Sequence, residues 1–239
     1  MVGYTLDSII SPGFRFYQPE QGYRVNIDTV ILYDFAKRHV TGRVLEIGSA
    51  SGSTCILLSK VAGVVDVTGV EINQVHHRAS LKNLGLHSCG DRVAFIHGDI
   101  NAYKTLFRPQ SFHAIVTNPP FYRYGTGKIS PREPIAASHH DRSLTLEALF
   151  AAARYLLRPD GVLIMLFTTR RIDEIFMNMR GFAIEQLRFV HRTAARPSDV
   201  FLMTARKGRG GRPSIIPPLI VHEGAGYSAE ASAMLAATP

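Results

Sequence analysis

Apolar residues follow two alternating patterns from about residue 27 onward. Short apolar runs of strand length alternate with segments in which apolar residues recur at helical spacing. Repeated strand, helix, strand units predict a parallel sheet with helices on both faces. The expected strands are 43–48, 66–72, 93–97, 111–117 and 162–168, and the expected helices are 27–39, 54–61, 74–84, 101–106, 144–157 and 172–179.

The end of the pattern differs from the rest. Two apolar strips, 183–190 and 200–205, are joined by a polar stretch without a helix, so they are expected to form an antiparallel pair that ends the sheet. The fold class is therefore α/β, with a seven-stranded, mostly parallel sheet and a C-terminal antiparallel strand. We expect an N-terminal extension over 1–27, a main domain over 28–206 that opens with Asp28 as a helix cap, and a basic linker and tail over 207–239.

Polar and glycine residues mark the ends of the first three expected strands, where an open α/β sheet binds its ligands. The first strand runs into E-I-G-S-A-S-G, 46–52, whose glycines permit a tight turn, although the spacing lacks the third glycine of a dinucleotide fingerprint. Glu71 ends the second strand and either accepts the two hydroxyls of a ribose or caps the next helix. Asp99 follows the third and either accepts from an adenine amine or caps a helix.

The fourth strand runs into T-N-P-P-F-Y, 117–122. Pro119 and Pro120 remove two backbone donors and turn the neighbouring carbonyl groups away from a ladder. The Asn118 side chain and those carbonyls can accept hydrogen bonds from a planar amine, and Phe121 offers a ring on which a base can stack. In isolation such a row is a turn more often than a site; after three other polar strand ends it indicates a binding site.

Charge and composition narrow the setting. Residues 1–120 carry 11 basic and 9 acidic side chains, whereas 121–239 carry 16 and 10, so a polyanionic partner such as RNA would use the second half; a solvated basic surface is the alternative. The two cysteines lack the spacing of metal ligands, and histidines such as the adjacent pair His76 and His77 are expected at the surface, so no metal site is predicted. The low cysteine count predicts a cytoplasmic chain, and the lack of a long apolar run predicts no membrane partner. The densest basic set is Arg188, Arg192, Arg196, Arg206, Lys207, Arg209 and Arg212, with Tyr124 and Lys128 as further candidate RNA contacts.

Taken together, E-I-G-S-A-S-G, V-E-I-N, H-G-D and N-P-P-F resemble the Rossmann-like class I S-adenosylmethionine-dependent methyltransferases that methylate amino groups with an N-P-P-[FY] or D-P-P-[FY] motif. The segment 18–32 and the ending 217–230 resemble, more narrowly, the bacterial transfer RNA adenine-N6-methyltransferases that act beside the anticodon of valine transfer RNA. The resemblance implies S-adenosylmethionine as cofactor, S-adenosylhomocysteine as product, and RNA, with transfer RNA first, as partner.

The same resemblance implies a role for each matching residue. Asn118 and the Pro119 carbonyl would accept the target amine, with Pro120 and Phe121 completing the catalytic motif. Glu71 would bind the ribose of the cofactor, and Asp99 its adenine. The remaining implied cofactor contacts are Glu46, Gly48, Ser49, Ala50, Gly52, Ile72 and Ile100, together with Asn118.

Three other functions stay open at this point. The same motif serves enzymes that methylate guanine in ribosomal RNA and enzymes that methylate a glutamine amide in a protein. A module that binds both cofactor and RNA without catalysis is the alternative of another class. The basic second half of the chain favours an RNA substrate over a protein.

Overall fold

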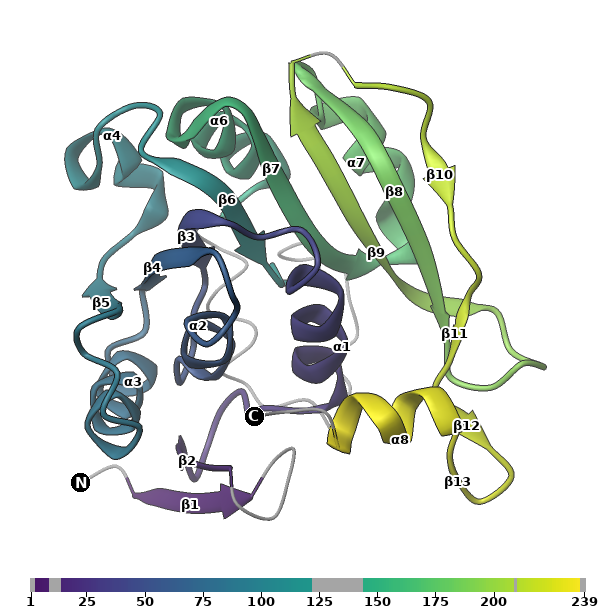
Figure 1. The fold of residues 1–239 in the computed structure, drawn as a ribbon, viewed down its shortest axis with the longest axis horizontal. Helices are drawn as coiled ribbons and strands as arrows, with labels where there is room; N and C mark the ends of the chain where they lie inside the picture. The colour runs from purple at the N-terminus through teal and green to yellow at the C-terminus, as the bar shows by residue number, and fades with distance from the viewer. Residues whose placement is uncertain (1–2, 9–13, 122–143, 209, 237–239) are drawn as a thin grey trace.

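One nine-stranded sheet forms the centre of the part of the chain that the computed structural model describes, residues 3–8, 14–121, 144–208 and 210–236 (Figure 1). Its strand order is β10-β8-β9-β7-β6-β3-β4-β5, and β11 also pairs with β8. The strands are β3 (Gly42–Ile47), β4 (Val64–Glu71), β5 (Val93–His97), β6 (Phe112–Thr117), β7 (Leu157–Thr168), β8 (Phe182–His191), β9 (Ser198–Lys207), β10 (Ser214–Ile215) and β11 (Leu219–Ile220).

The expected α/β class and mostly parallel sheet are confirmed. Strands β3 to β7 pair in parallel, while β9 runs antiparallel to both of its neighbours, β7 and β8. The seven strands from β3 to β9 are those that the apolar pattern predicts. The short strands β10 and β11 extend the edge beyond β8 and were not predicted, because two-residue strands leave no periodic pattern.

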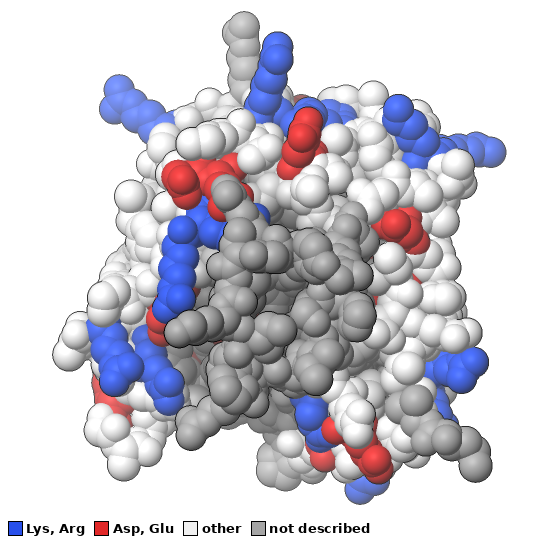
Figure 2. All heavy atoms as spheres, turned by 180° about the vertical axis from the view of Figure 1, so that it is seen from behind, with Lys and Arg blue, Asp and Glu red and all other residues white. Residues whose placement is uncertain are grey.

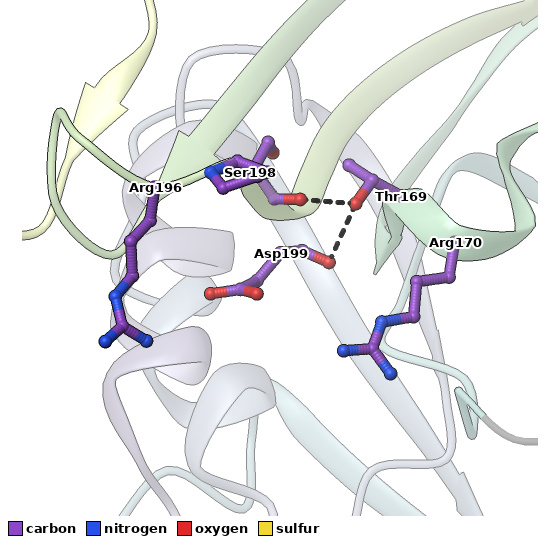
Figure 3. A pocket seen from close by; sticks show the side chains of 6 residues that line it. Thr169, Arg170, Arg196, Ser198 and Asp199 are labelled. Atoms are coloured by element: carbon purple, nitrogen blue, oxygen red, sulfur yellow. Dashed lines mark hydrogen bonds between the residues drawn. The ribbon is translucent and has the colours of Figure 1, made fainter.

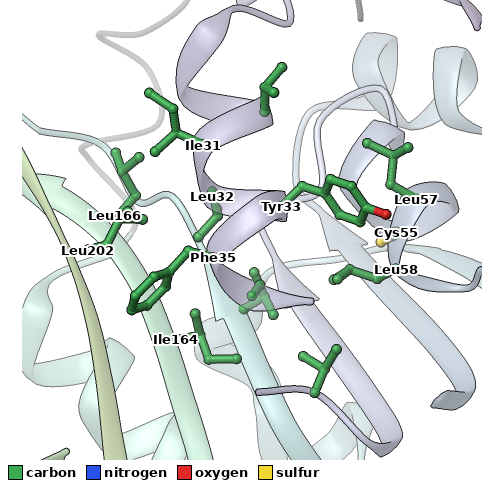
Figure 4. Close-up of a cluster of buried hydrophobic side chains, with 14 of the residues drawn as sticks. Ile31, Leu32, Tyr33, Phe35, Cys55, Leu57, Leu58, Ile164, Leu166 and Leu202 are labelled. Atoms are coloured by element: carbon green, nitrogen blue, oxygen red, sulfur yellow. The ribbon is translucent and has the colours of Figure 1, made fainter. Parts of the chain in front are cut away.

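Helices cover both faces of the sheet, and alternate residues of each strand serve the two faces. In β7, Ile164 and Leu166 join the core around α1 and α2, whereas Met165 and Phe167 join the core around α6 and α7. Figure 4 shows the first core, in which side chains of α1 and α2 meet those of β7 and β9. The helices are α1 (Ile27–Ala36), α2 (Ser53–Leu58), α3 (Gln74–Leu86), α4 (Tyr103–Leu106), α6 (Leu146–Leu156), α7 (Ile172–Asn178) and α8 (Ala229–Ala236), with single turns η1 (Ile100–Ala102) and η2 (Thr169–Arg171).

Both ends of the chain pack against this domain. The hairpin of β1 (Tyr4–Ser8) and β2 (Arg15–Pro19) is joined to α3 by Asn83, whose side chain bonds the backbone N–H and C=O of Tyr17. At the other end, α8 lies beside α1 (Figure 1), preceded by the small hairpin of β12 (His222–Glu223) and β13 (Gly226–Tyr227).

Two local expectations are corrected. Helix α1 is capped by Asn26, whose Oδ1 accepts from the Asp28 backbone N–H at 2.9 Å, so Asp28 lies inside the first turn and is not the cap. Strand β7 starts at Leu157, five residues before its predicted start at Val162, because Leu157 already pairs with Phe112 ahead of a register shift.

The strand order reverses between β3 and β6, the point at which open α/β sheets bind ligands. Ile47 and Thr117, the last residues of the two strands, are register partners. The buried Thr117 hydroxyl donates to the Ile47 carbonyl at 3.0 Å, which fixes the two strand ends against each other. Gly48 and Asn118 therefore leave the sheet side by side.

Candidate functional site

The loop after β3 has the backbone conformation of a glycine-rich turn. Gly48, Ala50 and Gly52 have φ angles of 76°, 45° and 82°, in the left-handed region. A Cβ on Gly52 would approach the Phe95 ring to 2.3 Å, whereas a Cβ on Gly48 would meet nothing within 4 Å. Packing thus requires glycine at Gly52, while the backbone at Gly48 borders open space. Ser49 Oγ is buried and has no hydrogen-bond partner among the described residues.

Glu71 holds this loop through its carboxylate. Its Oε2 accepts from the Ala50 backbone N–H at 2.8 Å, and its Oε1 accepts from the Asn73 backbone N–H at 2.7 Å. The cap of α3 is Asn73, whose Oδ1 accepts from the N–H groups of Val75 and His76. Glu71 is therefore not the helix cap; it links the end of β4 to the turn after β3. Each carboxylate oxygen has a second lone pair with which to accept from a ligand hydroxyl.

Asp99 forms the cap that its alternative interpretation predicted. Its Oδ1 accepts from the backbone N–H and the side-chain Nδ2 of Asn101, at 2.9 and 3.0 Å, at the start of η1. Ile72 and Ile100, two further candidate cofactor contacts, differ in exposure. Ile100 is buried in the core beside α6, whereas Ile72, directly after β4, is 39% exposed.

Asn118 lies against a residue that sequence reasoning missed. Burial raises the pKa of the Tyr23 hydroxyl, and side-chain hydrogen bonds with Thr29 and Asn118 oppose this effect. The Asn118 side chain therefore lies beside the Tyr23 hydroxyl, which also bonds Thr29. Tyr23 belongs to the segment 18–32, in which Gln18 and Arg24 instead bond Asp7.

The aromatic end of the motif is braced from two sides. The Phe121 ring packs edge to face on Phe167, with ring centroids 5.8 Å apart. Arg171 Nη1 donates to the Phe121 carbonyl at 3.1 Å, and the same guanidinium forms a two-pronged ion pair with Glu174. Pro119 is buried and Pro120 half-buried between Asn118 and this platform. Arg171 and Glu174 were also missed; their i, i+3 spacing at the start of a helix was the available signal.

Glu46 is a buried carboxyl beneath the glycine-rich turn. Its Oε2 accepts from the Cys55 thiol at 2.8 Å. Burial raises the pKa of Glu46 from 4.5 to about 7, opposed by the hydrogen bonds from Cys55 and Thr54 and reinforced by the negative charge of Glu71. The group therefore changes its protonation state close to neutral pH.

This raised pKa predicts a pH-dependent stability. The folded protein binds a proton on Glu46 up to about pH 7, whereas the unfolded chain releases it near pH 4.5, so the free energy of unfolding falls as pH rises through that interval. We expect wild type to lose about 3 kcal/mol between pH 4.5 and 8 relative to Glu46→Gln. Urea unfolding of both proteins at several pH values measures the difference, and parallel curves would show that burial does not perturb this carboxyl.

The structure divides the predicted RNA-binding residues between two edges of the sheet. Arg206 and Lys207 lie at the edge opposite Asn118, where Arg206 is paired in register with Val162 and is bound to Glu185. Arg188 is buried, with its guanidinium bound to Glu230 and to the Pro217 carbonyl. These three side chains thus have structural partners. Arg192 and Arg196, in contrast, lie exposed in the β8–β9 turn, at the edge that carries Asn118.

Three members of the predicted set, Tyr124, Lys128 and Arg209, lie outside the described residues, and Arg212 is exposed between β9 and β10. On the face drawn in Figure 2, Lys and Arg side chains lie at several separate places around the margin, with Asp and Glu among them. On this face, therefore, the basic side chains do not gather into one nucleic-acid surface.

A family model named Methyltransferase small domain matches residues 23–180, which include the turn after β3, Glu71, Asp99 and Asn118. The chain belongs to this family. Relatives named tRNA1(Val) (adenine(37)-N6)-methyltransferase include a protein of Porphyromonas gingivalis, 25% identical over 85% of this chain and 83% of the relative, and one of Vibrio parahaemolyticus, 25% identical over 90% of both.

Solved structures share the fold of this methyltransferase. A protein of Agrobacterium tumefaciens described as a predicted O-methyltransferase superimposes with a TM-score of 0.67 over 87% of this chain and 95% of its own, at 17% identity. The protein in the complex of aTrm5 and tRNALeu superimposes with a TM-score of 0.60 over 86% of this chain and 53% of its own, at 12% identity. The enzyme is an S-adenosylmethionine-dependent methyltransferase.

The described residues hold neither a metal-binding cluster nor a membrane-spanning helix. No group of three or more His, Cys, Asp and Glu side chains could hold a metal ion there. None of the helices in the described ranges is long and apolar enough to cross a membrane. His76, expected at the surface, is 2% exposed in the first turn of α3, so the expectation is wrong for this residue.

Proposed function

We propose that this enzyme transfers the methyl group of S-adenosylmethionine to the exocyclic amine of an adenine in RNA, and that its substrate is a transfer RNA methylated beside the anticodon. The observation that carries the proposal is the register of Ile47 with Thr117, which starts the cofactor turn and the amine-binding motif side by side. The names of the relatives support adenine and transfer RNA as the acceptor.

The residues around the turn fit the cofactor. Open space beside Gly48 allows a ligand to lie against the backbone, and the spare lone pairs of Glu71 suit the two ribose hydroxyls. Ser49, Ala50, Ile72 and Ile100 complete the proposed contacts by position, although the Ala50 N–H is committed to Glu71. Two residues lie nearby at either end: Glu46 beneath the turn, toward the proposed methionine end, and Asp99 at the end of β5, toward the adenine.

The chemistry needs alignment more than a strong base. The bound cofactor supplies a methyl group already activated by a positively charged sulfur. The lone pair of an exocyclic amine is conjugated into its ring, so Asn118 Oδ1 and the Pro119 carbonyl assist by accepting hydrogen bonds from its two N–H groups at fixed positions. As the nitrogen takes the methyl group, S-adenosylhomocysteine leaves and one amine proton passes to water. Phe121 holds the ring by stacking, a contact worth about 1 to 3 kcal/mol. The adenine must be unpaired or flipped out of its helix to reach these groups.

Tyr23 acts in this scheme as a positioning residue. Tyr23→Phe removes the hydroxyl that is hydrogen-bonded with Asn118, so we expect kcat to fall roughly 10-fold, the effect of one hydrogen bond, while the dissociation constant of S-adenosylmethionine stays unchanged. Tyr33→Phe, a buried tyrosine of α1 away from the motif, serves as the control. Single-turnover methylation and cofactor titration separate the two effects. A Tyr23→Phe enzyme with wild-type kcat would show that Asn118 needs no such support.

Labelled S-adenosylmethionine tests the acceptor class. We expect transfer into bulk transfer RNA, with little into ribosomal RNA, and none into a release-factor protein that carries a glutamine acceptor. Transfer into the protein alone would contradict the RNA assignment. Transfer into ribosomal RNA as methylguanosine would keep the reaction type and replace the substrate. Cofactor binding without transfer to any acceptor would indicate a non-catalytic module.

A further inference from the structure

A hollow of about 400 Å³ opens beside the proposed target site, between the end of β7 and the β8–β9 turn. Figure 3 shows Arg170 and Arg196 on its two sides, with Asp199 between them. Thr168, the last residue of β7, is paired in register with Val200, so the hollow lies at the same edge of the sheet as Asn118. The lining residues are Thr169, Arg170, Arg196, Pro197, Ser198 and Asp199.

The backbone of the hollow is held firmly while its charged side chains project from it. Thr169 Oγ1 donates to the Ser198 carbonyl at 2.6 Å and lies 3.2 Å from the Asp199 carbonyl, as drawn in Figure 3. Ser198 Oγ also bonds within the strand ends, to the Val190 and Val200 carbonyls. His191 Nδ1 bonds the Arg196 carbonyl at 2.8 Å, which fixes the turn. A ligand would therefore meet a preformed site.

Arg170 and Arg196 differ from Arg171 and Arg188 in having no internal ion-pair partner among the described residues. Arg170 and Arg196 are exposed, and neither forms an ion pair with another residue that the structure describes. Arg171 and Arg188 are used internally by Glu174 and Glu230. Two guanidinium groups on one hollow suit a phosphate, which they bind through planar, paired donors.

Residues next to the lining of the hollow contact the proposed target site. Arg171, next to Arg170 in the chain, donates to the Phe121 carbonyl at 3.1 Å. On the other side, the charge of Asp199 acts on Asp28 in the first turn of α1 and adds to the burial that raises the pKa of Asp28. An RNA strand that stacks one base on Phe121 would therefore bring its neighbouring nucleotide to the hollow.

We propose that this hollow binds a nucleotide adjacent to the methylated one, with a phosphate on Arg170 and Arg196. The Asp199 carboxylate repels a phosphate placed centrally, so the phosphate lies at the outer ends of the guanidinium groups and a ribose 2′-hydroxyl faces Asp199. The inference rests on RNA as the substrate. Such binding would keep an unstacked adenine in place on Phe121, because the neighbouring RNA backbone is held at the same edge of the protein's sheet.

The double variant Arg170→Ala/Arg196→Ala tests this site, with Arg158→Ala/Arg180→Ala as a charge-matched control at the opposite edge, where both arginines are exposed. The probe is an RNA stem-loop that contains the adenine methylated by wild type. We expect the dissociation constant of the RNA to rise roughly 10- to 100-fold in the first variant, and the slope of log affinity against log salt to fall by about 1. S-adenosylmethionine affinity stays at the wild-type value.

A second arm identifies the phosphate. Single methylphosphonates, which lack the charge, replace the phosphates flanking the target adenine one at a time. One replacement is expected to weaken binding to wild type and to have no further effect on Arg170→Ala/Arg196→Ala. If wild type methylates the RNA but the double variant binds it like the control, the hollow is not an RNA site. If wild type transfers no methyl group to RNA at all, the proposed function fails and this inference with it.

Discussion

Replacing Asn118 by alanine lowers the rate of methyl transfer roughly 100- to 1,000-fold on this account, while the protein still binds S-adenosylmethionine. The reason is geometric. Asn118 Oδ1 is the acceptor that places one amine proton, and its loss leaves the amine free to rotate away from the reactive methyl group. Asn118 contributes to the alignment of the acceptor but not to the fold of the sheet, which is fixed one residue earlier by Thr117.

Two comparisons make the Asn118 result specific. Asn118→Asp retains an acceptor oxygen, as in the D-P-P-[FY] form of the motif, and is expected to keep more activity than Asn118→Ala. Asn178→Ala removes an asparagine that only bonds the Glu174 carbonyl on α7 and is expected to behave as wild type. Single-turnover rates at saturating RNA and cofactor provide the measurement. An Asn118→Ala enzyme with a wild-type rate would remove Asn118 from the catalytic motif.

Replacing Glu71 by alanine acts on the other half of the proposed site, and we expect it to weaken S-adenosylmethionine binding roughly 100-fold. Charged hydrogen bonds to two ribose hydroxyls contribute about 3 kcal/mol between them, which corresponds to that factor. The variant also releases the Ala50 N–H, and with it the left-handed turn that places Gly48 at the open space. Both effects act in the same direction.

A double-mutant cycle separates these two effects of Glu71. A cofactor analogue that lacks the ribose 2′-hydroxyl should bind wild type more weakly than S-adenosylmethionine does, whereas Glu71→Ala should bind the two equally. Asp66→Ala, which removes a carboxylate at the start of the same strand, is the control. Calorimetric titration gives the affinities, and thermal unfolding shows that each variant is folded. Equal discrimination by wild type and Glu71→Ala would place the ribose elsewhere.

The fold was predictable from the sequence wherever apolar periodicity was strong. Strands β3 to β9 were all predicted because each is a mainly apolar segment of strand length, even in β5, where only Val93 is buried. The N-terminal hairpin was not predicted, since Y-T-L-D-S and R-F-Y-Q-P alternate weakly and their stability comes from contacts with α3, such as those of Asn83.

Some residues of the candidate site were predictable from the sequence and others were not. Gly48, Glu71, Asp99 and Asn118 were found because each directly follows or ends a recognisable strand, and parallel strands bring their ends to one edge. Tyr23 was missed, since nothing local tells that a residue before α1 reaches the end of β6. Such a contact depends on how α1 packs across the sheet.

The basic residues show the limit of charge as a signal. Density along the chain grouped Arg188, Arg196 and Arg206, yet the antiparallel turn of β9 sends Arg206 to the far edge and Arg188 pairs with a glutamate of the tail. Arg170 was not selected because it lies outside that dense segment. Only the arrangement of the strands brings Arg170 and Arg196 to one hollow.

Nucleoside analysis of transfer RNA tests the central claim most directly. Transfer RNA from cells that lack this enzyme is incubated with S-adenosylmethionine and purified wild-type protein or Asn118→Ala, digested, and analysed by mass spectrometry. We expect N6-methyladenosine, mapped to one position beside the anticodon, with wild type and none above background with Asn118→Ala. A methylated guanosine, an unmodified transfer RNA, or equal N6-methyladenosine with both proteins would contradict this claim.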